Sequence, residues 1–220
     1  MTEAIAGGPE AFLESLREEL SPCAHPHHVS FAAVLAERGL ALVGEYADWK
    51  PRLGQGASPL QIVEALWDHA CELAIAPDPP DGFEADSAEE QFLTNYRQIS
   101  PDQFGEFEAD LSDLGALVDP DRFAAFRSYR GIWLLKLAMR CCATGAGVAE
   151  AVTAARASLH ISADSGLSEG YVSDQFLRER WNVPKVQAEA RLQSKLARTL
   201  RATPRIAPDA VIALRRDFVT

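Results

Sequence analysis

Four short segments of the chain carry the residue pattern that begins an α-helix, and this pattern constrains the fold more than any other feature. Residues 58–61 and 100–103 both read Ser-Pro-x-Gln, residues 87–90 read Ser-Ala-Glu-Glu, and residues 119–120 read Asp-Pro. Their hydroxyl or carboxylate oxygens can accept hydrogen bonds from free backbone N–H groups, and in all but residues 87–90 a proline occupies the first helical turn, where its missing donor is not needed. Because no stretch alternates apolar and polar residues between hairpin turns, the sequence predicts an all-α protein.

Apolar residues recur at helical spacing along most of the chain and predict about nine or ten helices. The helix predicted over residues 120–143 is the longest and most apolar, and it includes Phe126, Trp133 and Leu137. We expect it to be the central helix of a multi-helix bundle. The predicted helices span residues 9–20, 30–48, 59–76, 87–99, 101–117, 120–143, 147–160, 168–181, 184–201 and 208–217.

The charge of the chain changes sign near residue 170. The net charge is −11 overall, yet residues 170–220 contain ten Lys or Arg and five Asp or Glu. A glycine-containing break at residues 144–147 precedes this change. Together these features predict an acidic helical domain over residues 1–147 and a basic helical unit over residues 148–220, with packing into one domain as the alternative.

The basic unit contains a segment, residues 171–200, that resembles a helix-turn-helix module of bacterial regulators. A predicted helix ends at Trp181, a tight turn follows at Asn182 and Val183, and a second helix contains Arg191 and Leu192. The regulator modules carry Phe-Gly-Val-Ser and then Arg-Leu in this pattern, and their second helix enters the DNA major groove. Asn182 replaces the commoner glycine, and asparagine tolerates the left-handed backbone of such a turn. The resemblance implies DNA binding.

A helical wheel of residues 184–201 places several basic and polar side chains on one face and the leucines on the other. Such a row, if exposed, can contact phosphates and a base edge in DNA. The alternative is a helix whose basic face is solvated or paired with the acidic remainder of the protein. The candidate nucleic-acid-binding residues are Lys185, Gln187, Arg191, Lys195, Arg198 and Arg201.

A run of cysteine and histidine at residues 23–28 is the most suggestive pattern for metal chemistry. Thiol and imidazole groups are ligands for zinc and other transition metals, but the spacing here is tighter than in usual zinc pairs. A polar loop with a proline between two helices is the alternative. The candidate metal ligands are Cys23, His25, His27, His28, His69 and Cys71.

No nucleophile elbow, phosphate-binding loop or dinucleotide fingerprint occurs in the sequence, so we predict no catalytic residue and no cofactor. The apolar segment at residues 132–143 is interrupted by Lys136 and Arg140, and residues 1–6 lack a signal-peptide pattern. We therefore expect a cytoplasmic protein with no membrane partner and with reduced cysteines.

The patterns together predict a DNA-binding regulatory protein. Its acidic helical body would serve for sensing or homodimerisation, and its C-terminal helix-turn-helix would bind DNA. One alternative is a helical protein-interaction module, such as an adaptor, chaperone, immunity-type protein or DNA mimic, that binds a protein partner through its acidic surface. The other is a metal-dependent enzyme that uses the cysteine and histidine run.

Overall fold

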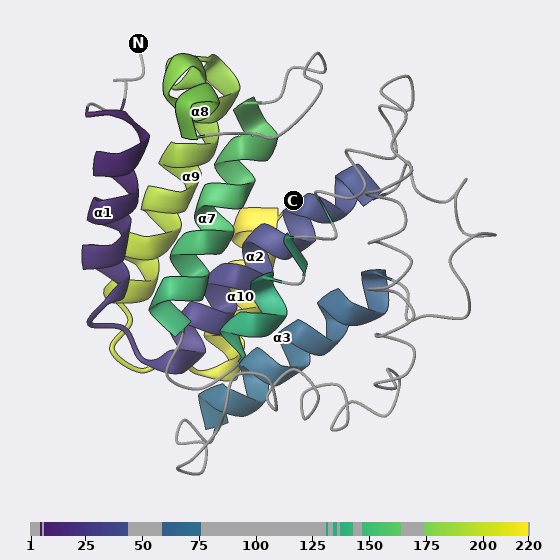
Figure 1. Cartoon of the computed structure of the whole chain (residues 1–220). Helices are drawn as coiled ribbons and strands as arrows, with labels where there is room; N and C mark the ends of the chain where they lie inside the picture. The colour runs from purple at the N-terminus through teal and green to yellow at the C-terminus, as the bar shows by residue number, and fades with distance from the viewer. Residues whose placement is uncertain are drawn as a thin grey trace, which may run out of the picture.

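The structure is a computed structural model that describes residues 5, 7–43, 59–75, 131, 134, 135, 137–142, 147–163 and 174–219. The described residues are mostly helical and form no strand, which confirms the prediction of an all-α, multi-helix protein (Figure 1). None of the described helices is long and apolar enough to cross a bilayer. The labelled helices are α1 (Gly8–Leu20), α2 (His25–Val43), α3 (Pro59–Ile75), α7 (Gly147–Ala163), α8 (Asp174–Arg180), α9 (Pro184–Arg201) and α10 (Pro208–Val219).

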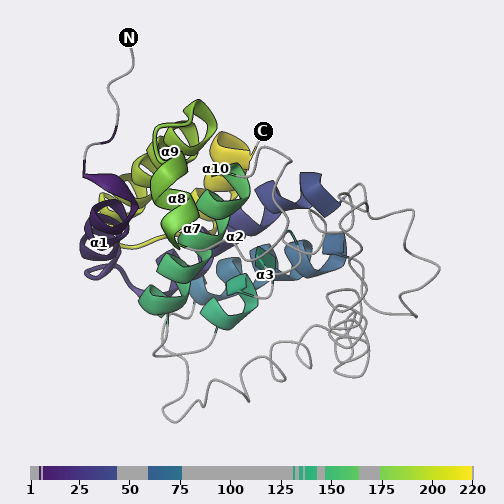
Figure 2. The same cartoon turned by 45° about the horizontal axis from the view of Figure 1, so that its top comes forward.

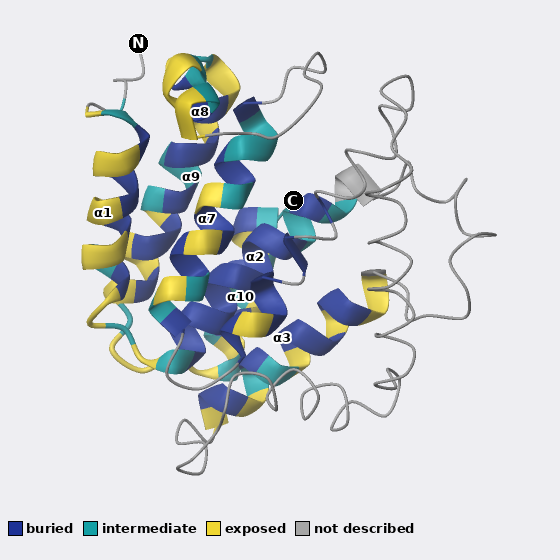
Figure 3. Cartoon of the chain, viewed as in Figure 1, coloured by how far each residue is buried: buried dark blue, intermediate teal, exposed yellow. Residues whose placement is uncertain are grey.

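Helices α1, α7 and α9 form a three-helix group in which each helix contacts the other two (Figures 1 and 2). One face of α1 is apolar and points into the core, where Phe12, Leu13, Leu16 and Leu20 are all buried. The opposite face of α1 carries glutamates and is exposed (Figure 3). Each fully buried leucine contributes roughly 2 kcal/mol through removal of its apolar surface from water. Hydrophobic packing of amphipathic helices therefore stabilises this group.

Helix α2 occupies the centre of the described bundle. All residues from Pro26 to Ala36 are buried, and the helix packs against α3, α7, α9 and α10 (Figure 3). At Gly39 a Cβ atom would lie 3.1 Å from a Leu134 methyl group and 3.8 Å from the Gly131 backbone. A glycine here permits close approach of α2 and the segment that contains Gly131.

The described part of the predicted central helix is helical at residues 131, 134, 135 and 137–141, and only Arg140 is exposed there. Leu134, Leu135, Leu137 and Met139 are at most 2% exposed. This part of the chain therefore lies in the core, as expected of a central helix. Most of residues 120–143, and the helices predicted at 87–99 and 101–117, lie outside the described residues.

Helix α2 begins earlier than the sequence predicts, at His25 rather than near residue 30, so residues 25–28 are not a loop. Pro26 lies in the first helical turn, where the missing N–H has no partner to lose. The Ser30 hydroxyl donates to the Pro26 carbonyl at 2.7 Å. The α1–α2 connection is consequently short and comprises residues 21–24.

Helices from both sides of residue 147 contribute to one hydrophobic cluster. In particular, α1 packs on α9 and α2 packs on α7. The described helices of the two ranges thus form a continuous core, and the division into residues 1–147 and 148–220 stays a prediction.

Candidate functional site

The candidate site is built on α9, which a short turn connects to α8. The Trp181 N–H donates to the Arg178 carbonyl at 3.3 Å, and the Val183 N–H donates to the Arg180 carbonyl at 2.9 Å. Val183 is the N-cap of α9 with extended backbone, and Pro184 follows in the first turn. Asn182 does not adopt the left-handed conformation that the sequence suggested, because the only described residues with positive φ are Gly7 and Gly8.

The burial of one face determines how α9 is rotated about its own axis. The core-facing side packs against α1, α7 and α2. The residues of α9 buried on this side are Val186, Gln187, Glu189, Ala190, Gln193, Leu196, Ala197 and Leu200. With this side buried, Lys185, Lys195 and Arg198 are exposed and Arg191 is half-buried.

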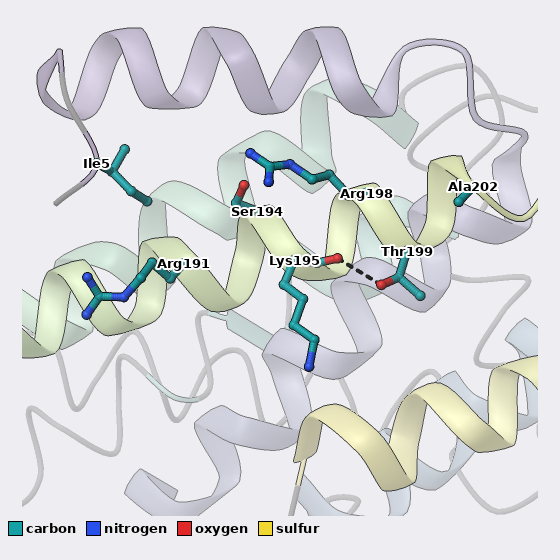
Figure 4. A pocket seen from close by; sticks show the side chains of 7 residues that line it. All are labelled: Ile5, Arg191, Ser194, Lys195, Arg198, Thr199 and Ala202. Atoms are coloured by element: carbon teal, nitrogen blue, oxygen red, sulfur yellow. Dashed lines mark hydrogen bonds between the residues drawn. The ribbon is translucent and has the colours of Figure 1, made fainter. Parts of the chain in front are cut away.

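The outward face of α9 forms a shallow groove of about 610 Å³. Figure 4 shows its cationic side chains spreading from the helix, with Arg198 directed toward α1 and Lys195 toward α10. The groove is lined by Ile5, Arg191, Ser194, Lys195, Arg198, Thr199 and Ala202. It is open and follows the helix axis, so its shape suits an extended chain better than an enclosed small molecule.

The groove has a uniformly positive character along α9. The one carboxylate of this helix, Glu189, is buried on the opposite side. The Lys195 ammonium lies 5.2 Å from the centre of the Phe218 ring, a cation–π contact that leaves its charge intact. Within the described part of the chain, Arg198 forms no ion pair. These features favour an anion at this surface.

The end of the cationic row is neutralised by the protein itself. Arg201 is exposed, but its guanidinium donates to a Glu19 carboxylate oxygen on α1 at 2.8 Å. A second arginine, Arg178 on α8, pairs with Glu10 of the same helix α1. The pairing with acidic residues that the sequence left open therefore applies to Arg201, whereas Lys195 and Arg198 have no described carboxylate partner.

Gln187 was predicted to belong to the exposed row, and this was wrong. The side chain is 4% exposed, its Oε1 accepts from the Ile5 N–H at 2.8 Å, and its Nε2 donates to the Trp181 carbonyl at 2.9 Å. A residue held in this way cannot reach a base edge while the fold is intact. The helical wheel placed Gln187 on the exposed face because we assumed that polar side chains of this helix point toward solvent.

A buried polar network on the inner side of α9 was not predicted. The Glu189 carboxylate accepts from Arg38 of α2 at 3.1 Å, from the Ser158 hydroxyl of α7 at 2.7 Å and from Gln193 at 3.0 Å. Arg38 also donates to the Phe218 carbonyl of α10 at 3.2 Å. The network joins α2, α7, α9 and α10 and fixes the rotation that turns the cations outward. The one feature of the sequence that pointed to this network was Glu189, which lies on the same face of α9 as the leucines.

The histidines proposed as metal ligands serve instead as hydrogen-bond donors to backbone carbonyls. His25 Nε2 lies 3.2 Å from the Cys142 oxygen, His27 Nε2 lies 2.7 Å from the Thr203 oxygen, and His28 Nε2 lies 2.9 Å from the Leu20 oxygen. The Cys23 thiol faces the Glu19 carbonyl at 3.6 Å.

The structure also places the remaining candidates, His69 and Cys71, on α3. Both side chains are partly buried there, and burial lowers the pKa of His69 to about 4 and raises the pKa of the Cys71 thiol. Within the described ranges, no three His, Cys, Asp or Glu side chains converge as a metal site would require. The metal-dependent enzyme therefore gains no support from this geometry.

Comparison of the chain with protein-family models, with characterised proteins and with solved structures finds no match. The described residues form an all-α bundle in which the groove-lining face of α9 carries cationic side chains.

Proposed function

We propose that the protein is a DNA-binding regulatory protein whose α9 groove contacts the phosphate backbone. One observation carries this proposal: Arg191, Lys195 and Arg198 line a single open groove on a helix face without carboxylates. The acidic helical remainder of the chain would have the sensing or dimerising role.

The dimensions of the row support a phosphodiester chain as ligand. Residues 191 and 198 are separated by about 10 Å along a helix that rises 1.5 Å per residue. One DNA strand presents a phosphate about every 3.4 Å along its axis. The three cations therefore match about three phosphates, and the Ser194 hydroxyl also lines the groove, whereas the Thr199 hydroxyl donates to the Lys195 carbonyl at 2.9 Å. Because Gln187 is buried, these contacts position the DNA without reading bases through that residue.

The salt dependence of binding to a labelled mixed-sequence duplex, measured by fluorescence anisotropy, tests the proposal. Three phosphate contacts give a slope of about −2.7 in log affinity against log salt, which is roughly a 40-fold loss of affinity between 50 and 200 mM salt. The variant Arg191→Ala/Lys195→Ala/Arg198→Ala should lose this dependence almost completely. Absence of salt-sensitive binding by the unchanged protein would refute the proposal.

A matched control removes the same charge elsewhere. Arg17, Arg140 and Arg216 are exposed and do not line the groove. The variant Arg17→Ala/Arg140→Ala/Arg216→Ala should retain the slope of the unchanged protein. If both triple variants weaken binding equally, general charge attraction rather than the groove accounts for it.

A further inference from the structure

The backbone of Ile5, which precedes α1, is held from two sides by residues at the start of α9. Its N–H donates to Gln187 Oε1 at 2.8 Å, and its carbonyl accepts from the indole N–H of Trp181 at 3.1 Å. Gln187 Nε2 in turn donates to the Trp181 carbonyl at 2.9 Å. The three residues thus form a closed circuit of hydrogen bonds between the segment before α1 and the α8–α9 turn.

This circuit lies in a well-packed environment. Gln187 and Trp181 are 4% and 5% exposed, and the Trp181 ring lies 5.6 Å from the Phe12 ring of α1, measured between centroids. The Gln187–Trp181 hydrogen bond is buried and the two bonds to Ile5 are partly buried, so breaking them would leave poorly solvated groups without a partner. The position of Ile5 is therefore coupled to the start of α9.

The Ile5 side chain is one of the groove-lining side chains, and Figure 4 shows it near the Arg191 end of the cationic row. An apolar side chain beside cations excludes water from that side of the groove. Charge interactions are stronger where water is excluded, because the effective dielectric constant is lower.

We propose that Gln187 and Trp181 are positioning residues that hold Ile5 as an apolar wall of the anion-binding groove. The wall strengthens the attraction between the groove and a phosphodiester chain without adding charge. This inference rests on the proposed function of the groove, and it assigns a role in binding to a segment far from α9 in the sequence.

The substitution Ile5→Ala tests the wall directly, because it leaves both backbone hydrogen bonds in place. We expect the affinity for the labelled duplex to fall roughly fivefold, equivalent to about 1 kcal/mol, with the salt slope unchanged. The matched control is Ile75→Ala, which truncates a residue that is 69% exposed on α3 and does not line the groove. Its affinity should equal that of the unchanged protein.

The positioning role is tested by Gln187→Met, which keeps the side-chain length, and by Trp181→Phe, which keeps a smaller aromatic ring. Each substitution removes a hydrogen bond to Ile5. Both should weaken duplex binding at constant salt slope, and Gln187→Met should accelerate hydrogen exchange of the Ile5 amide measured by NMR. If Gln187→Met does not fold, the result for Trp181→Phe decides whether the positioning role is correct, since this variant keeps an aromatic ring beside Phe12. Thermal unfolding of each variant verifies the fold.

The outcomes separate the two proposals. If Ile5→Ala binds the duplex with unchanged affinity, or loses no more affinity than Ile75→Ala, the proposed role of Ile5 is refuted and the proposed function is not affected. Unchanged affinity in a folded Gln187→Met or Trp181→Phe protein overturns the positioning role. If the unchanged protein does not bind the duplex at all, both the proposed function and this inference are refuted.

Discussion

Glu189 is a carboxylate buried within the bundle, and its burial is tolerated because three side chains donate to it. Those donors come from α2, α7 and one turn further along α9. Removing one partner of a buried ion pair lowers the free energy of unfolding by more than the intact pair contributes to it, because the remaining buried charge has no opposite charge beside it. The network therefore specifies one rotation of α9 relative to its neighbours.

Replacement of Glu189 should destabilise the protein strongly. In Glu189→Ala, Arg38 and Ser158 lose their acceptor and a cavity forms, so we expect the free energy of unfolding to fall by about 3 kcal/mol. Urea unfolding followed by circular dichroism measures this change. Glu18→Ala, at an exposed site on α1, serves as control and should change stability by less than about 0.5 kcal/mol. A loss in Glu189→Ala as small as that of the control would contradict the structural role of the network.

At the scale of elements, α10 is attached to the bundle by Arg215. Its guanidinium donates to the Glu37 carboxylate of α2 at 2.8 and 2.9 Å and also pairs with Glu64 of α3. The same Glu37 accepts from the Trp67 indole at 2.6 Å, and Arg215 lies 5.7 Å from the Trp67 ring centre. These contacts raise the pKa of Arg215 and lower the pKa of Glu64, the hydrogen bond between them being the main cause in both cases.

Loss of the Arg215 contacts should destabilise the packing of α10 more than that of the other helices. We expect Arg215→Ala to lower the free energy of unfolding by about 2 kcal/mol and to accelerate amide hydrogen exchange in α10. Arg215→Lys should restore little, since an ammonium group cannot form the planar two-carboxylate contact. The neighbouring Arg216 is 74% exposed on its side chain and pairs with Asp217, so Arg216→Ala is the control. Equal effects at the two positions would refute the attachment.

At the scale of the whole molecule, the burial of several histidines disfavours the charged form of their rings. Burial lowers the pKa of His69 to about 4, with the charge of His25 as a smaller cause. Burial also lowers the pKa of His25 and His28, whose rings hold carbonyls of the 131–142 segment and of α1. The fold thus favours the uncharged form of each ring.

Stability should therefore decrease as the pH falls below neutrality. An unfolded chain takes up a proton on each histidine near pH 6.5, whereas the folded protein resists until a lower pH, so the unfolded state binds more protons in that window. His69 alone should lower the free energy of unfolding by about 2 kcal/mol between pH 7 and pH 5. Urea unfolding at both pH values measures this. The variant His69→Gln should have a smaller pH dependence, and an equal dependence in both proteins would contradict the assignment.

Sequence patterns predicted the helices well wherever apolar residues face inward. Apolar residues at helical spacing are buried in α1 and in α3, because an amphipathic helix turns its apolar face toward the core. In α3 these residues are Ile62, Leu66, Trp67 and Leu73. The residues predicted to bind nucleic acid lie in different surroundings in the structure. Arg191, Lys195 and Arg198 line one groove, but Gln187 is buried and Arg201 is paired.

The spacing of apolar residues and the residues that begin helices thus determined by themselves that this chain is helical and where several helices begin. They also determined that the face of α9 opposite its leucines is basic. Tertiary structure decided which polar groups stay in water. Gln187, Glu189 and Gln193 are buried because their partners come from residues 5, 38, 155 and 158, among others, which are distant in sequence. A buried polar group is stable only when such partners satisfy it, and spacing along one helix contains no information about them.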